Sequence, residues 1–243
     1  MTLTGKTVLI TGANRGIGRA LAAEALARGA KRVYAGTRQP LPHPDDRVTP
    51  LNLDVTSTAQ IQAAAGQVGS LDMLINNAGI ALPDDLSDPA ALERHLAVNL
   101  FGSYAVTQAF LPALIRSRGA IVNILSVNAL APLPFIIPAY SVSKAAAFSL
   151  TQSLRARLAG QGVRVHAVLP GPVDTDMTRG SAIPKASPES VALAIFDAVE
   201  AGEEEIFPDP ASAPLAALWR DGAAKMLERQ LAQVPAAPGS VPL

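Results

Sequence analysis

Residues 11–18 read TGANRGIG and place glycine at positions 12, 16 and 18. The stretch follows a short β-branched run at 6–11 (KTVLIT), and an apolar pattern of helical spacing then continues to Gly29, a natural helix C-cap. A side chain at such a strand-to-helix turn would keep a phosphate from the backbone N–H groups, so glycine is needed there. The stretch predicts a phosphate-binding turn; the alternative is a glycine-rich turn without a ligand.

Strand-like and helical patterns alternate along the rest of the chain, and this alternation indicates βαβ units. We expect a doubly wound, Rossmann-type parallel sheet with helices on both faces, in one α/β domain over residues 1–234. Residues 235–243, rich in Pro, Ala and Gly, are expected to form a flexible tail. The predicted strands are 6–11, 32–37, 48–53, 71–76, 120–125, 163–169 and 205–207, and the predicted helices are 17–29, 58–68, 89–117 with a bend at Pro112, 139–159, 188–200 and 213–231.

Composition narrows the range of partners. The 20 Lys and Arg residues balance the 20 Asp and Glu residues, and with 4% aromatics this disfavours nucleic-acid binding. Cysteine is absent and the three histidines are far apart, so we expect neither thiolate chemistry nor a metal site. The sequence opens without a signal-peptide pattern, and three prolines interrupt the longest uncharged stretch, 119–143. We therefore expect a cytoplasmic protein without a membrane segment.

Several further motifs follow the glycine turn, whose spacing is G-x-x-x-G-x-G rather than G-x-G-x-x-G. They are NNAG at 76–79, Asn99, Ser126, the pair Tyr140-x-x-x-Lys144, and Pro170 and Gly171 with Thr175 beyond. In this order they resemble the short-chain dehydrogenase/reductase family, over about residues 4 to 210. The resemblance implies a Rossmann fold, a nicotinamide dinucleotide cofactor and oxidoreductase activity.

Tyr140 and Lys144 stand four apart on a predicted helix, so both project from one face. A free phenol has a pKa of about 10, and a nearby ammonium favours the phenolate, so we expect Lys144 to lower the pKa of Tyr140. The resemblance implies that Tyr140 is the general acid/base that protonates the nascent alkoxide and that Lys144 also holds the nicotinamide ribose. The alternative is a surface helix pair.

Two further catalytic roles are implied by the resemblance. Ser126 would donate to the substrate oxygen, although Leu125 stands where the family often has a second serine; a capping or turn role is the alternative. Asn99 would hold a helix kink and a water that links Lys144 to solvent; a buried structural asparagine is the alternative.

The end of the second predicted strand bears on the choice of cofactor. An NAD site usually has Asp or Glu there for the ribose 2′-OH, but this chain has Gly36, Thr37 and Arg38. Arg38 and Arg15 could fork onto a 2′-phosphate, so we expect NADP(H); the alternative is that both arginines are solvated.

The resemblance implies further cofactor contacts. Asp54 would meet the adenine amino group beside Val55, residues 77–79 would line the adenosine ribose, and Thr175 would bond the carboxamide. Asp54 could instead be a surface-turn aspartate, and the Pro-Gly pair could be a turn signal alone. The expected cofactor-binding residues are Gly12, Asn14, Arg15, Gly16, Ile17, Gly18, Arg38, Asp54, Val55, Asn77, Ala78, Gly79, Tyr140, Lys144, Pro170, Gly171, Val173 and Thr175.

The function expected from this resemblance is an NADPH-dependent ketone or aldehyde reductase. The mostly apolar residues 127–137 predict an open site for hydrophobic carbonyl compounds, although they could equally be core. The alternatives are an NADP(H)-binding regulator without turnover, and an epimerase, dehydratase or imine reductase of the same family. The apolar helices 89–117 and 139–159 could pack a homodimer or homotetramer.

Overall fold

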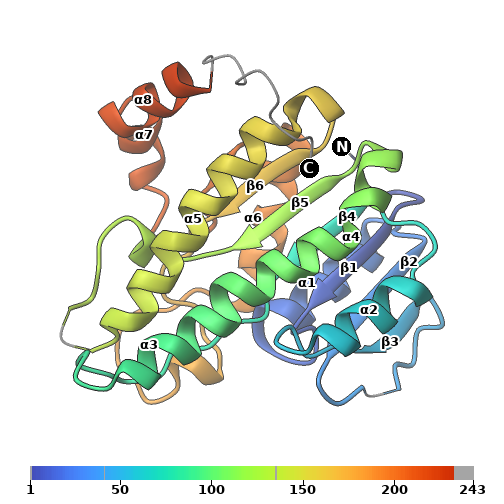
Figure 1. The fold of residues 1–243 in the computed structure, drawn as a ribbon, viewed down its shortest axis with the longest axis horizontal. Helices are drawn as coiled ribbons and strands as arrows, with labels where there is room; N and C mark the ends of the chain where they lie inside the picture. Colours follow the sequence, from blue (N-terminus) through green and yellow to red (C-terminus); the bar gives the residue numbers. More distant parts are fainter. Residues whose placement is uncertain (1, 41, 135, 233–243) are drawn as a thin grey trace.

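The computed structural model describes residues 2–40, 42–134 and 136–232, and shows one seven-stranded sheet in which every neighbouring pair is parallel (Figure 1). The strand order is β3-β2-β1-β4-β5-β6-β7. All seven predicted strands are present, whereas the predicted tail 235–243 lies outside the described residues. The strands are β1 (Thr7–Thr11), β2 (Arg32–Thr37), β3 (Val48–Asn52), β4 (Met73–Asn76), β5 (Ala120–Ile124), β6 (Arg164–Val168) and β7 (Glu205–Ile206).

Helices cover both faces of the sheet, as the doubly wound prediction requires (Figure 1). On one face, α1 (Gly16–Ala27) and α6 (Pro188–Ala201) pack side by side. On the other lie α2 (Thr58–Gln67), α4 (Ser103–Ser117) and α5 (Pro138–Leu158), whose apolar residues share a second core cluster. The central strands are therefore buried on both sides, which explains why β1 reads as an unbroken apolar and threonine run rather than an alternating one.

The predicted helix 89–117 is irregular in the middle. It consists of α3 (Pro89–Leu96), a π-helical segment (Ala97–Gly102) and α4. The stretch Pro89–Ser117 is long and apolar enough to cross a membrane by length and composition alone. Its buried residues Val106, Phe110 and Leu114 pack into the core, so core packing accounts for part of its apolar character.

The prediction of a single helix over 213–231 is wrong. The segment forms two short helices, α7 (Leu215–Arg220) and α8 (Ala223–Leu231). Gly222 has extended backbone angles and precedes α8, and a side chain there would lie 2.7 Å from the Leu218 carbonyl oxygen. Glycine is a poor helix former, and here it allows the chain to turn between two helices.

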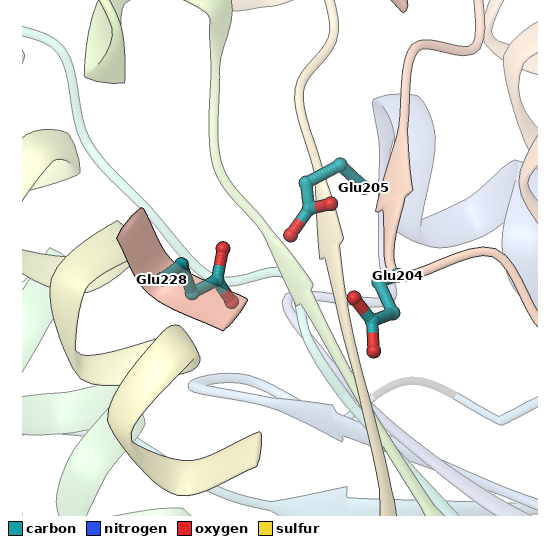
Figure 2. Close-up of side chains that lie close together, drawn as sticks. All are labelled: Glu204, Glu205 and Glu228. Carbon is teal, nitrogen blue, oxygen red and sulfur yellow. The ribbon is translucent and has the colours of Figure 1, made fainter. Parts of the chain in front are cut away.

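An ionic cluster fastens α8 to the rest of the fold. Figure 2 shows three carboxylates that converge between β7 and α8, those of Glu204, Glu205 and Glu228. The buried Lys225 ammonium lies 2.7–3.1 Å from all three, and the Arg155 guanidinium of α5 lies 2.6 Å from Glu205 and from Glu228. Because two cations already occupy the space between the three acids, we interpret the cluster as a structural link rather than a metal site.

Parallel strands have their carboxyl ends at one edge of the sheet. The strand order reverses between β1 and β4, so the connections that follow these two strands diverge to opposite faces. In open α/β sheets this switch point is where a crevice forms and ligands bind. The motifs of the sequence follow β1, β2, β3, β4, β5 and β6, so the fold gathers them at this edge.

Candidate active site at the carboxyl edge of the sheet

The turn after β1 brings backbone surfaces into close contact. Gly12 and Gly16 have positive φ angles of 68° and 50°. A Cβ atom on Gly18 would lie 2.2 Å from the Gly12 carbonyl oxygen, so only glycine fits there. The turn leads directly into α1, whose N-terminal N–H groups and dipole favour an anion. This cradle suits a phosphate group.

The NNAG segment is fastened to this turn. The Thr11 hydroxyl oxygen accepts hydrogen bonds of 3.0 Å from the backbone N–H groups of Asn77 and Ala78. The Asn77 side-chain amide donates to the carbonyl oxygens of Thr11 and Gly12, at 2.9 and 3.1 Å. Residues 77–79 therefore lie against the glycine turn, as a shared dinucleotide site requires.

A polar cleft of about 440 Å³ adjoins the glycine turn. Arg15 lines it and forms a 2.8 Å ion pair with Asp176, which follows Thr175 in the connection after β6. This pair lowers the pKa of Asp176. Asp176 was not predicted, and no sequence pattern marked it, because the turns after β1 and β6 meet only in the folded chain.

Arg38 and Asp54 follow neighbouring strands, β2 and β3, and lie close enough for Arg38 to contribute to a lowered pKa of Asp54. The larger cause of that shift is the hydrogen bonding of Thr56 to the Asp54 carboxylate. Within the described part of the chain, the exposed Arg38 side chain has no hydrogen bond or ion pair. Its guanidinium is therefore available to a ligand.

Tyr140, Ser126 and Lys144 are buried together. The Tyr140 hydroxyl hydrogen-bonds with Ser126, which follows β5, and the Lys144 ammonium lies 5.6 Å from the centre of the Tyr140 ring. Lys144 donates a 2.8 Å hydrogen bond to the Ile124 carbonyl oxygen at the end of β5. Ser126 also accepts from the Asn128 N–H, so it has the turn role that the sequence left as an alternative.

The expectation that Lys144 lowers the pKa of Tyr140 is wrong. Burial raises the pKa of Tyr140 to about 12, and the hydrogen bond with Ser126 offsets only part of that rise. Burial also lowers the pKa of Lys144 to about 8. Desolvation disfavours both charged forms, and it exceeds the attraction that sequence spacing alone suggested. At neutral pH the phenol therefore keeps its proton.

Asn99 lies inside the π-helical segment, where the implied helix irregularity is found. Its side-chain oxygen accepts from the Ile80 N–H, and its amide donates to the Ile80 carbonyl and the Ser143 hydroxyl, each at 2.9 Å. These contacts correspond to the structural role left open by the sequence. Gly79 lies beside it, because a Cβ atom there would be 3.2 Å from the Asn99 oxygen and 3.6 Å from the Lys144 ammonium.

A small cavity with both polar and apolar lining residues lies behind these residues. Its volume of about 10 Å³ is at the lower limit for one water molecule. Asn76, Asn99, Ser103, Thr107 and Asn123 contribute the polar groups of its lining. The Asn76 amide donates to Thr107 and Asn123, whereas its buried side-chain oxygen has no partner among the described residues. The cavity thus has room for about one water beside Asn99, while the expected water link between Lys144 and solvent stays a prediction.

Asp209 fastens the turn after β6, and sequence reasoning missed it. Its buried carboxylate accepts a 2.8 Å hydrogen bond from the Gly171 N–H and further bonds from the Ala211 N–H and from the N–H and hydroxyl of Ser212. A Cβ atom on Gly171 would lie 2.8 Å from the same carboxylate. Asp209 thus holds the turn after β6, but a lone aspartate in the sequence PDPASAP resembles an ordinary turn residue.

The remaining predicted residues also lie at this edge. Asn14 is exposed in the glycine turn, the side chain of Val55 is buried in the core, and that of Ile17 is half-buried against it. Val173 forms a bridge with Ala186, and Thr175 contacts the glycine turn 3.0 Å from where a Cβ of Gly16 would stand. With the glycine cradle and the free Arg38, this residue set fits a phosphate-bearing dinucleotide.

Comparisons with known proteins agree with this geometry. A family model described as short chain dehydrogenase matches residues 6–185. Oxidoreductase UcpA of Salmonella typhimurium is 36% identical over 194 residues, which cover 74% of this chain and 74% of that protein. Two solved structures are similar. A Burkholderia cenocepacia short chain dehydrogenase in complex with NADP is 38% identical, with a TM-score of 0.84 and coverage of 95% of this chain and 100% of that one. A Brucella melitensis 3-ketoacyl-(acyl-carrier-protein) reductase complexed with NADH is 26% identical, with a TM-score of 0.74 and coverage of 86% and 93%.

We predict that Asp209→Ala destabilises the fold by about 3 kcal/mol, because several buried donors lose their acceptor at once. Urea unfolding followed by circular dichroism measures the change, with Asp221→Ala, at an exposed position before α8, as the control. If both variants unfold at the same urea concentration, the anchoring role of Asp209 is wrong.

Proposed function

The chain belongs to the short-chain dehydrogenase/reductase family and is a dehydrogenase/reductase acting on alcohol or carbonyl groups, and on this premise we propose that it is an NADPH-dependent ketone or aldehyde reductase with Tyr140 as general acid. The observation that carries the proposal is the buried Tyr140 hydroxyl, hydrogen-bonded to Ser126 beside Lys144. Tyr140 would protonate the substrate oxygen while Ser126 donates a second hydrogen bond to it.

The raised pKa of Tyr140 suits it to donate a proton to the substrate oxygen. A phenol with a pKa of about 12 carries its proton at neutral pH, so it can donate without prior activation. When bound, NADPH supplies the hydride for the carbonyl carbon. Lys144, anchored on the Ile124 carbonyl, would hold the nicotinamide ribose and return a proton to Tyr140 after each turnover.

The site residues divide the cofactor between them. The glycine turn at 12–18 would take the pyrophosphate, Asp54 and residues 77–79 the adenosine, and the turn at 170–175 the nicotinamide. The preference for NADPH rests on the free guanidinium of Arg38 and the absence of a carboxylate at the end of β2. Arg15 would contribute after leaving Asp176. The NADP complex of the similar Burkholderia protein supports this preference.

A hydrophobic carbonyl compound is the proposed substrate class. Exposed apolar side chains occur on three connections at the carboxyl edge, namely Leu82 after β4, Leu133 and Ile136 after β5, and Met177 and Ile183 after β6. Burying such side chains against an apolar substrate is favourable, by about 25 cal/mol per Å².

We further propose that the protein is a homodimer or homotetramer through α4 and α5. Phe101 of the π-helical segment, Tyr104 of α4 and Val142 of α5 expose 60%, 42% and 46% of their surface, and the π-helical segment contacts both helices. Light scattering coupled to size exclusion is expected to give two or four times the 25.1 kDa chain mass. A single-chain mass at micromolar concentration would contradict the proposal.

Tyr140→Phe tests the function. We predict that it lowers carbonyl-dependent NADPH oxidation at least about 1000-fold, since the proton donor is lost, and changes the Kd for NADPH less than about threefold. The wild type is first assayed with aromatic ketones, aldehydes, sugars and imines, by the absorbance of NADPH. Carbonyl reduction that persists in Tyr140→Phe would overturn the role of Tyr140, and a wild type active only on imines would overturn the substrate class.

Arg38→Asp tests the choice of cofactor. The substitution removes a phosphate partner and adds a carboxylate for a ribose hydroxyl. The ratio of kcat/KM for NADPH to that for NADH is therefore expected to fall by about 10- to 100-fold. Arg220→Asp, the same charge change on α7, serves as the control and should leave the ratio unchanged. An unchanged ratio in Arg38→Asp removes Arg38 from the phosphate site.

A further inference from the structure

The helix that carries Tyr140 begins without a cap of its own. The first N–H groups of a helix have no partner within it and need an acceptor from elsewhere. In α5 the N-cap residue is Ile137, whose side chain cannot accept a hydrogen bond, and the next residue, Pro138, has no N–H. The first free N–H group is that of Ala139, which directly precedes Tyr140.

The acceptor for this group comes from the connection between β4 and α3. Both carboxylate oxygens of Asp84 accept from the Ala139 N–H, at 3.1 and 3.3 Å. The Asp84 N–H in turn donates to the Ile136 carbonyl oxygen at 3.3 Å. Asp84 therefore holds the start of α5 from both sides of its first residue, Pro138, although it stands 55 positions earlier in the sequence.

We propose that Asp84 is a positioning residue for Tyr140, which caps α5 so that the phenol stays against Ser126; the inference rests on the proposed function. A carboxylate is well suited to this place, because its charge also favours the positive end of the helix dipole. Asp84 acts through the backbone of α5 and does not itself touch the reacting atoms.

A buried histidine holds the Asp84 connection, between β4 and α3, in place. Imidazole Nε2 of His95 accepts from the Leu82 N–H at 3.0 Å, so Nδ1 carries the proton and donates to the Ala91 carbonyl at 2.7 Å. The His95 ring is fully buried and meets the Tyr140 ring edge to face, with centroids 6.4 Å apart. One histidine thus links α3, the Asp84 connection and the phenol.

Backbone strain in the same connection agrees with this view. Leu86 has a φ of 66°, in the left-handed region that disfavours a side chain. Its N–H donates to Asp84 at 3.3 Å, so the strained turn also orients the carboxylate. Strain of this kind persists where the surrounding contacts define the geometry, and it is concentrated at functional sites.

Four variants test the inference. Asp84→Ala removes the cap, and Asp84→Asn keeps an oxygen that can accept the same hydrogen bond. Asp88→Ala removes the equivalent cap of α3, a 2.9 Å bond to the Ala90 N–H. Asp85→Ala removes a neighbouring charge whose side-chain hydrogen bonds, among the described residues, go to Ser87 in the same connection. The readouts are kcat and KM with a carbonyl substrate, the Kd for NADPH by calorimetry, and hydrogen exchange of residues 139–144.

For Asp84→Ala we expect kcat to fall about tenfold while the Kd for NADPH changes less than about twofold, since small misplacements of a catalytic group are costly. Exchange of residues 139–144 should speed up about tenfold, as a capping bond is lost. Asp84→Asn should restore most of kcat, and Asp85→Ala and Asp88→Ala should keep kcat within about twofold of the wild type.

An unchanged kcat in Asp84→Ala, or an equal loss in Asp88→Ala, would overturn the positioning role. Hydrogen exchange separates the two proposals, because it does not depend on activity. If the wild type reduces no carbonyl compound but exchange accelerates only in Asp84→Ala, the proposed function fails and the cap stands. If exchange is unchanged in Asp84→Ala, the cap itself is wrong, whatever the activity.

Discussion

The site depends on the burial of an ammonium group and a phenol side by side. Lys144 is only 5% exposed, and its one protein hydrogen bond among the described residues goes to the Ile124 carbonyl at the end of β5. Burying a cation with so few partners costs free energy, and this burial lowers the pKa of Lys144. Any shift between the end of β5, the first turns of α5 and the Asn99 segment would leave a buried polar group unpaired. These three segments are therefore held in one arrangement. The same burial keeps Tyr140 protonated.

A row of hydrogen-bonded polar side chains beneath the site holds the sheet and helices in that arrangement. Asn76 of β4 and Asn123 of β5 stand opposite one another in the sheet, and their amides bond to each other and to Thr107 of α4 and Thr151 of α5. All four residues are buried, so each unmade bond would cost free energy. Apolar packing alone permits helices to slide along a sheet, whereas these directional bonds fix how far α4 and α5 extend toward the carboxyl edge.

The predictable parts were those that depend on local sequence. The central strands were visible, because a parallel strand buried on both faces reads as a short apolar, β-branched run. The glycine turn was visible, because a close backbone approach excludes every side chain. Other features depend on distant contacts. The sign of the Tyr140 pKa shift follows from burial, which helical spacing does not report, and Asp209 and Asp84 work only because Gly171 and Ala139 fold against them. The break between α7 and α8 could have been predicted from Gly222, although the apolar periodicity favoured one continuous helix.

The segment after β7, which carries no recognisable motif, has a physical reason to belong to the domain. Asp209 anchors the turn that faces the proposed nicotinamide site, and sixteen residues later the Lys225 cluster secures α8 to β7 and, through Arg155, to α5. Trp219 of α7 lies between these two anchors and packs edge to face on Phe148 of α5, at 5.2 Å between ring centres. Through the Trp219–Phe148 contact and the Lys225 cluster, the segment is thus held at two points to α5, the helix that carries Tyr140. Displacing it would expose a buried carboxylate and two cations at once, so the segment after β7 and α5 are expected to move as one unit.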